Sequence, residues 1–143
     1  MRRKGRNILF IFIAFALFAF VIGFLLWNKP HVNVKDADAV TTDAIALYNS
    51  FMSDSAKANS IFLNKVVQVS GVVREVSVNQ QQQQIILLQT SVPGASVNCT
   101  MEQNRNKIKQ GDRVVIKGIC SGYIGGDRET GIPGDVVLIR CYP

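Results

Sequence analysis

Histidine is almost missing from this sequence of 143 residues, which contains only His31. Histidine is the side chain that most often transfers protons near neutral pH, and it is a common metal ligand. His31 has no neighbours suited to a metal site. Asp127, Glu129 and Asp135 share one glycine-rich loop, but their spacing matches no calcium-binding loop, so we expect them to keep the loop solvated. The sequence therefore predicts a protein that is not an enzyme and needs no metal or other cofactor.

Aromatic residues are missing from a long internal stretch, because no Phe, Tyr or Trp occurs between Leu63 and Gly122. Domains that bind single-stranded nucleic acid stack the bases on aromatic side chains, at about 1–3 kcal/mol per base. The aromatic residues on either side of this stretch are Tyr48, Phe51, Phe62, Tyr123 and Tyr142. The sequence therefore argues against nucleic acid as a partner.

Cysteine is scarce as well, with three residues and no pair at the CxxC spacing of redox catalysts and zinc sites. Strand periodicity predicts that Cys99, Cys120 and Cys141 point into a core, as small hydrophobic residues. In the last strand, we expect Arg140 to be exposed, so that Val137, Ile139 and Cys141 point inward. An exported protein can form disulfides, so a bridge between Cys120 and Cys141 is a second interpretation, and Cys99 with Cys141 is the next choice.

The sequence does contain one uninterrupted hydrophobic run, residues 8–27, which holds no charged residue. As a helix, about 20 residues span the roughly 30 Å hydrocarbon core of a bilayer. A cleaved signal peptide is the alternative. Its apolar region would be shorter and would end at small residues, whereas this run ends in Leu25, Leu26 and Trp27. We therefore predict an uncleaved transmembrane signal anchor.

The distribution of charge predicts how that anchor is oriented. Four of the 16 basic residues precede the run, in residues 1–7. By the positive-inside rule this segment is cytoplasmic, and the C-terminal part is periplasmic or otherwise extracytoplasmic. Without those four, 12 basic residues remain against 10 acidic ones, so topology accounts for most of the net charge of +6. We interpret residues 28–40 as a polar linker.

One group of basic residues remains in the exported part and comprises Arg105, Lys107, Lys109 and Arg113. It could contact an acidic partner or anionic lipid headgroups. Acidic residues flank it, so a solvated loop is the interpretation that we favour. Tyr123 is a further candidate contact, because it lies in the long glycine-rich loop of residues 122–134 and loops on a rigid scaffold often carry binding.

The pattern of apolar residues over residues 41–143 predicts one helix followed by five strands. Apolar residues at three- and four-residue spacing indicate a helix over residues 42–58, with Thr41 or Thr42 as its N-cap. The five strands, which alternate at period two, are expected near residues 66–76, 85–88, 96–100, 113–119 and 135–141. Such spacing indicates a sandwich or barrel, and a long first strand with a bend or bulge at Gly71 favours a mainly β, OB-type Greek-key barrel.

Several motifs in this part carry a resemblance to a known family. They lie in residues 48–51, 56–59, 63–71, 97–99, 111–122 and 135–141, and they include the spacings K-x-x-x-V-x-G and G-D-x-V-x-x-K-G-x-C. Over residues 43–141 the sequence resembles the tRNA-anti-like OB-fold family. The resemblance implies an OB fold preceded by a helix, commonly in exported bacterial proteins, but a fold alone does not fix a function.

These observations predict a membrane-anchored, extracytoplasmic binding module without enzymatic activity. Residues 8–27 would contact the lipid bilayer, and the domain would bind an envelope protein or another envelope component. The hairpin tip at residues 79–84 and the loop at residues 122–134 are candidate contacts. The alternative is an OB domain that binds an oligonucleotide or oligosaccharide in the groove of the barrel.

Overall fold

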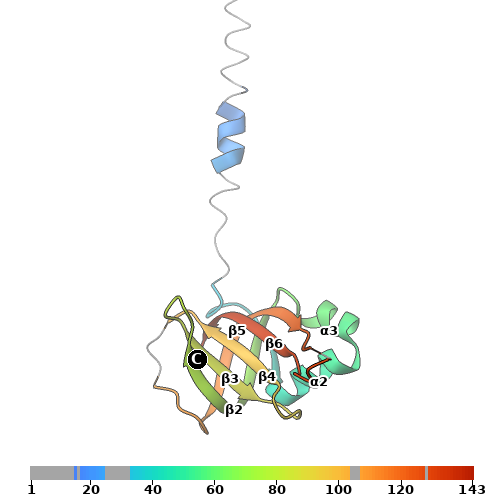
Figure 1. The fold of residues 1–143 in the computed structure, drawn as a ribbon. Helices are drawn as coiled ribbons and strands as arrows, with labels where there is room; N and C mark the ends of the chain where they lie inside the picture. The colour runs from blue at the N-terminus through green and yellow to red at the C-terminus, as the bar shows by residue number, and fades with distance from the viewer. Residues whose placement is uncertain (1–14, 16, 25–32, 104–106, 128) are drawn as a thin grey trace, which may run out of the picture. The chain divides into compact units, whose positions relative to one another are not determined.

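The computed structural model describes residues 15, 17–24, 33–103, 107–127 and 129–143. The chain divides into two compact units, residues 1–32 and 33–143. The second unit is a small β-barrel with two short helices (Figure 1). Because this unit begins at Asn33, it includes residues that the sequence assigned to the linker.

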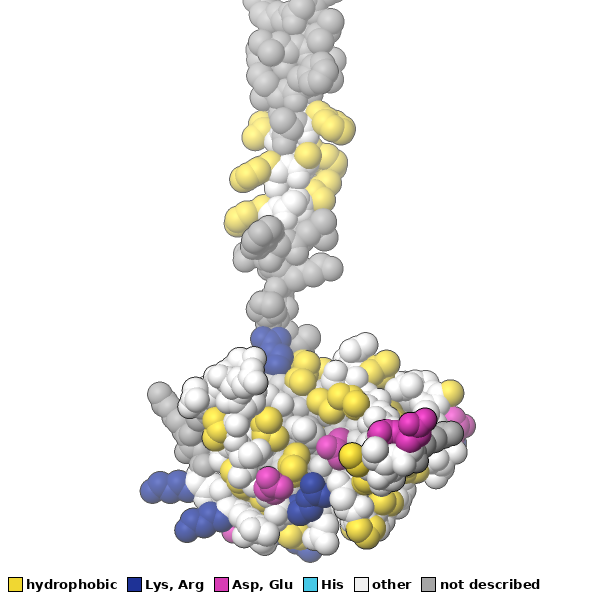
Figure 2. Space-filling model, viewed as in Figure 1, with side chains coloured by type: hydrophobic (Ala, Val, Ile, Leu, Met, Phe, Trp, Pro, Cys, Tyr) yellow, Lys and Arg dark blue, Asp and Glu magenta, His cyan; other side chains and the backbone are white. Residues whose placement is uncertain are grey.

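The first unit is described only in part. Residues 17–24 are helical, and their hydrophobic side chains are exposed on both sides of the helix (Figure 2). Most of the predicted anchor of residues 8–27, and all of the basic segment 1–7, lie outside the described residues. None of the helices in the described part of the chain has the length and apolarity needed to cross a bilayer.

Five strands close the barrel of the second unit. They are β2 (Val66–Val78), β3 (Gln84–Gln89), β4 (Ser96–Met101), β5 (Arg113–Ile124) and β6 (Asp135–Tyr142). Around the barrel they follow the order β2-β3-β4-β6-β5, and β5 pairs again with β2. All of these pairings are antiparallel except that of β4 with β6, which is parallel. A closed five-stranded Greek-key barrel of this kind is consistent with the predicted OB fold.

Two helices precede the barrel where the sequence predicted one. Strand β1 (Val40–Asp43) pairs with β2 and leads into α2 (Ala44–Ser53), which α3 (Ser55–Phe62) follows. The N-cap of α2 is Asp43 rather than either predicted threonine, and its carboxylate accepts a hydrogen bond of 2.8 Å from the Ala46 amide. Asp54 breaks the helix because its backbone is extended, and its side chain caps α3 in the same way.

Residues just before β1 pack on the barrel instead of forming a solvated tether. Val34 is buried, and the Lys117 ammonium donates a hydrogen bond of 3.0 Å to the backbone carbonyl of Lys35. The Lys35 ammonium in turn lies 4.7 Å from the ring centroid of Tyr142, a cation–π distance. These contacts fix residues 34 and 35 against β5 and β6.

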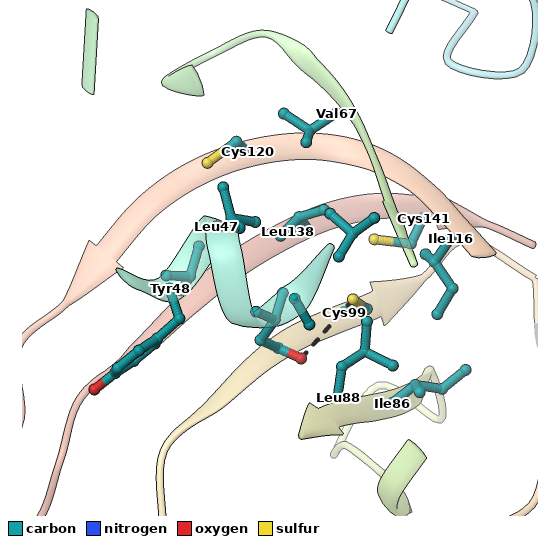
Figure 3. Close-up of a cluster of buried hydrophobic side chains, with 14 of the residues drawn as sticks. Leu47, Tyr48, Val67, Ile86, Leu88, Cys99, Ile116, Cys120, Leu138 and Cys141 are labelled. Carbon is teal, nitrogen blue, oxygen red and sulfur yellow. Dashed lines mark hydrogen bonds between the residues drawn. The ribbon is translucent and has the colours of Figure 1, made fainter. Parts of the chain in front are cut away.

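The core fills the barrel and is closed at one end by α2. Figure 3 shows Leu47 of α2 beside Leu138 of β6, and both residues are buried. The glycine predicted to mark a bulge, Gly71, has another role: a Cβ at this position would lie 3.1 Å from the Cβ of Ala44, so its absence lets α2 approach β2. The irregularity in β2 comes later, between Val73 and Glu75.

The inward face of β6 differs from the prediction. Val136 and Leu138 are buried, whereas Val137 and Ile139, which were predicted to point inward, are partly exposed. Cys141 is nevertheless buried as predicted, because the β4–β6 pairing shifts between Cys99 and Met101. From Leu138 to Cys141, β6 advances by three residues while its partner β4 advances by two, from Cys99 to Met101. The extra residue forms a bulge, which reverses the inward and outward alternation of side chains before Cys141.

Candidate functional site

A cleft between α2 and the loop that joins β5 to β6 is the best candidate for a binding site. Its volume is about 500 Å³. The lining residues come from the two helices, from the β3–β4 turn, from the end of β5 and from the β5–β6 loop. They combine apolar side chains with three glycines and one serine: Tyr48, Phe51, Met52, Ser55, Val92, Tyr123, Gly125, Gly126, Ile132, Pro133 and Gly134. Small-molecule and peptide sites on proteins are concave and mostly apolar, with a few polar groups.

Glycine residues shape the loop wall of the cleft. A Cβ at Gly134 would lie 2.5 Å from the Tyr123 hydroxyl, and one at Gly126 would clash with the Ile132 carbonyl. The ends of the loop therefore approach each other more closely than any other residue would allow. At the tip, the Asp127 carboxylate accepts a hydrogen bond of 2.9 Å from the Glu129 amide, and this bond is the main reason why the pKa of Asp127 is lowered. The loop is thus held in a defined shape.

Three aromatic rings form the floor of the cleft. The centroid of the Tyr123 ring lies 6.2 Å from that of Tyr48, edge to face, and 6.4 Å from that of Phe51, in a stacked arrangement. Burial raises the pKa of the Tyr48 phenol, and so do the charge of Tyr123 and its hydrogen bond with Tyr48. The floor is therefore uncharged, and because Tyr48 and Phe51 are buried, Tyr123 is the ring that remains partly exposed in the cleft.

Exposed apolar side chains surround this floor. Met52 is 45% exposed, Val92 is 38% exposed and Ile132 is 62% exposed. Hydrophobic side chains exposed singly are common on protein surfaces, but three around one cleft indicate a contact surface. The arrangement can hold an apolar side chain, and the Tyr123 hydroxyl can hydrogen-bond with a polar group beside that side chain.

The predicted binding residues do not come together. Arg105 lies outside the described residues, while Lys107, Lys109 and Arg113 are exposed near the start of β5. Tyr123 lies near the other end of the same strand, ten residues from Arg113, which corresponds to about 30 Å along an extended strand. On the face of the barrel seen in Figure 2, side chains of both charges lie among uncharged ones. Only Tyr123, of the predicted set, belongs to the cleft.

Arg113 lines a different cleft, of about 640 Å³, beside the start of α2. The carboxylate of Asp43 lines it as well and already serves as the N-cap of α2. Both signs of charge therefore meet in this cleft, so it has no preference for an anionic ligand.

The predicted hairpin tip is confirmed as the turn between β2 and β3. The Asn79 side chain accepts hydrogen bonds from the amides of Gln81 and Gln83, at 3.0 and 2.9 Å. The turn is thus built from its own polar groups and presents no apolar surface.

The cysteines are buried free thiols, and Cys141 does not lie beside Cys120, the partner predicted for it (Figure 3). The side chain of Cys141 hydrogen-bonds with Cys99 instead, and burial alone is the main cause that raises the pKa of Cys120. Figure 3 shows the sulfur of Cys120 apart from the other two. In the part of the chain that the structure describes, no three His, Cys, Asp or Glu side chains gather as metal ligands.

Sequence reasoning missed the contribution of α2 and of Val92 to the cleft. The apolar spacing that indicates a helix over residues 42–58 does not separate Tyr48 and Phe51, which are buried, from Met52, which is exposed at the cleft. The available signal was the excess of glycine in residues 122–134, which permits a loop that folds back closely on the helix.

Comparison with known protein families identifies the family of this chain. No curated protein matches the chain. The model of the tRNA_anti-like family matches residues 1–130, most of the chain, and the closed five-stranded barrel is consistent with the OB fold that the resemblance implied. The chain therefore belongs to the tRNA_anti-like family.

Proposed function

We propose that this protein is a membrane-anchored, extracytoplasmic binding module without enzymatic activity, and that its cleft holds an apolar segment of an envelope protein. The observation that carries the proposal is the cleft itself. An aromatic floor, a glycine-shaped loop and three exposed apolar side chains converge on one end of a closed barrel. Loops held by a rigid scaffold are frequent binding sites.

The anchor is supported by the sequence and by the described part of the first unit. Residues 8–27 carry no charge, and Phe18, Phe20 and Phe24 are each more than 60% exposed on a helical segment. Apolar side chains around a whole helix suit a lipid environment, because lipid chains can surround them. The four basic residues in positions 1–7 place the N-terminus in the cytoplasm by the positive-inside rule.

A role without catalysis is supported by the bonds that the acidic side chains make. The Asp135 carboxylate accepts hydrogen bonds of 2.7 and 2.9 Å from the amide and hydroxyl of Ser96. Asp112 accepts one from the Lys109 amide at 2.8 Å. These carboxylates stabilise turns and strand ends, which is a structural role.

The alternative, an oligonucleotide or oligosaccharide in the barrel groove, has one observation in its favour. Asn98 lies on β4, within the strand pair that OB folds use for such ligands, and its buried side-chain oxygen has no hydrogen-bond partner among the described residues. A sugar hydroxyl or a base could supply that partner. However, β3 and β4 carry no aromatic residue on which a base or sugar ring could stack. We therefore rank this function second.

Site-specific photo-cross-linking in intact membranes tests the proposed function. A photoreactive residue replaces Ile132 at the cleft in one variant of the full chain, and Val115, 50% exposed on β5, in the control. We expect position 132 to give an adduct with a defined envelope protein, and position 115 to give none. Equal labelling from both positions would contradict the assignment of the cleft.

Protease treatment tests the location separately. A protease admitted to the extracytoplasmic side of intact inner membranes should digest residues 33–143. Digestion only after the membrane is opened would contradict the orientation while leaving the assignment of the cleft open to the cross-linking test.

A further inference from the structure

Two of the three cysteines lie side by side inside the barrel. Cys99 is on β4 and Cys141 is on β6, the parallel neighbour of β4, and both are fully buried. Figure 3 shows their sulfur atoms on the same side of the core, and the Cys141 side chain hydrogen-bonds with Cys99. The two thiols are thus in contact.

The bulge in β6 is what brings Cys141 to this position. Strict alternation after the inward-pointing Leu138 would have turned Cys141 outward. Arg140, with a φ of 53°, adopts the left-handed conformation that side chains other than glycine rarely take. Beyond the bulge, the Glu102 amide donates a hydrogen bond of 3.0 Å to the Cys141 carbonyl. Strand β6 thus departs from regular geometry at Arg140 and resumes backbone hydrogen bonding at Cys141, the residue whose sulfur lies next to Cys99.

Space for the Cys141 sulfur exists only because residue 118 is glycine. A Cβ at Gly118 of β5 would lie 2.5 Å from that sulfur atom. The sulfur is therefore confined between the bare backbone of β5 and the thiol of Cys99. Cys120 is not in a position to replace Cys99 as its partner, because the sulfur of Cys120 lies apart from the other two (Figure 3).

We propose that Cys99 and Cys141 form a disulfide that joins β4 to β6 inside the barrel and leaves Cys120 as the free thiol. The Cα atoms of a disulfide lie within about 7 Å. Same-face diagonal neighbours in a regular sheet are about 7–8 Å apart. Closing the bond therefore requires the two backbones to approach each other by only about 1 Å.

The bond forms by thiol–disulfide exchange with an external disulfide. The Cys141 thiolate attacks one sulfur of the external disulfide and releases one thiol. The Cys99 thiolate then attacks the Cys141 sulfur of the mixed disulfide and releases the second thiol. Two electrons and two protons pass from the cysteine pair to the oxidant, which becomes two thiols. Since both cysteines are sealed from solvent in the barrel, exchange takes place before the barrel closes, during folding.

This inference depends on the proposed function only for the supply of an oxidant, because an extracytoplasmic compartment favours disulfides. The test therefore begins in vitro. The full chain is reduced and denatured, refolded in detergent with a mixture of oxidised and reduced glutathione, and its remaining thiols are blocked. Trypsin places Cys99 in residues 75–105, Cys120 in residues 118–128 and Cys141 in residues 141–143, so each pairing gives a different cross-linked peptide.

We expect a loss of two hydrogens in the mass of the refolded chain and a cross-link between residues 75–105 and 141–143. Cys120→Ser, the matched control, should keep that cross-link, and Cys99→Ser should abolish it. A cross-link that includes Cys120, or three blocked thiols in the wild-type chain, would overturn the proposal without any need for a variant. A bridge that forms in vitro but is missing from protein isolated from cells would count against the extracytoplasmic location and not against the pairing.

Discussion

Replacing Gly118 with alanine tests the packing of the barrel most sharply. The added Cβ would lie 2.5 Å from the Cys141 sulfur, 3.3 Å from the Ile139 carbonyl oxygen and 3.4 Å from the Leu138 Cβ. The first contact is far inside the sum of the atomic radii. Either the Cys141 side chain leaves its position or strands β5 and β6 move apart.

The size of the effect follows from two opposing contributions. Inserting a methyl group into a filled core costs about 1–3 kcal/mol. Replacing glycine by alanine also restricts the unfolded chain, which returns about 0.4–1 kcal/mol where the backbone permits. Residue 118 is not among those with a positive φ, so the backbone does permit alanine. We expect Gly118→Ala to lower the free energy of unfolding by about 1 kcal/mol, the difference between the middle values of these two ranges.

A double-mutant cycle separates the sulfur contact from other causes. Gly118→Ala is measured by urea denaturation in reducing buffer, in the wild-type chain and in a Cys141→Ala chain that lacks the sulfur. Gly125→Ala serves as the control, because the nearest atom to its added Cβ lies at an ordinary 3.9 Å. The cost should fall by at least half in the Cys141→Ala chain. An equal cost in both chains would refute the reasoning.

Three further predictions concern α2, α3 and β6. Because burial, followed by Tyr123, raises the pKa of Tyr48, its contribution to stability is complete below the unfolded pKa of about 10 and is lost as the pH rises above it. Tyr48→Phe should therefore flatten the alkaline fall in the free energy of unfolding, measured by urea denaturation at a series of pH values, and an unchanged slope would contradict this. Asp54→Ala should cost about 1 kcal/mol in thermal unfolding through loss of the α3 N-cap, while Asp54→Asn should cost much less. Asp135→Ala should cost about 1–3 kcal/mol, because it leaves the buried Ser96 amide without an acceptor, and a cost near zero would show that another group takes its place.

The barrel was predictable from the sequence because most of its strands follow local rules. Along β5, the alternation that places Ile116 and Cys120 inward is visible in the residues themselves, and the structure confirms it. The reversal along β6 was not predictable. It depends on Arg140 in a left-handed conformation, and nothing about an arginine in a β-branched strand signals such a bulge. The break at Asp54 did have a signal, because aspartate is a preferred N-cap.

The candidate site was predictable only in one of its parts. The long glycine-rich loop and Tyr123 could be singled out, since glycine density marks a loop with unusual backbone geometry. The residues of α2 that line the cleft could not be singled out. The angle at which the helix crosses the end of the barrel decides which of its sides meets the core and which meets a loop. The basic residues near Arg113 share the strand of Tyr123, but the length of β5 keeps the two ends apart.

Recovery of the cross-linked partner from membranes tests the central claim most directly. The full chain, its Ile132→Asp variant and its Val115→Asp control are expressed at equal levels and cross-linked in intact membranes, and the co-purified envelope protein is quantified by mass spectrometry. A carboxylate placed at the apolar cleft loses its hydration when a partner binds, so we predict about a tenfold lower recovery for Ile132→Asp and little change for Val115→Asp. Equal recovery from all three chains would show that the cleft is not the binding site.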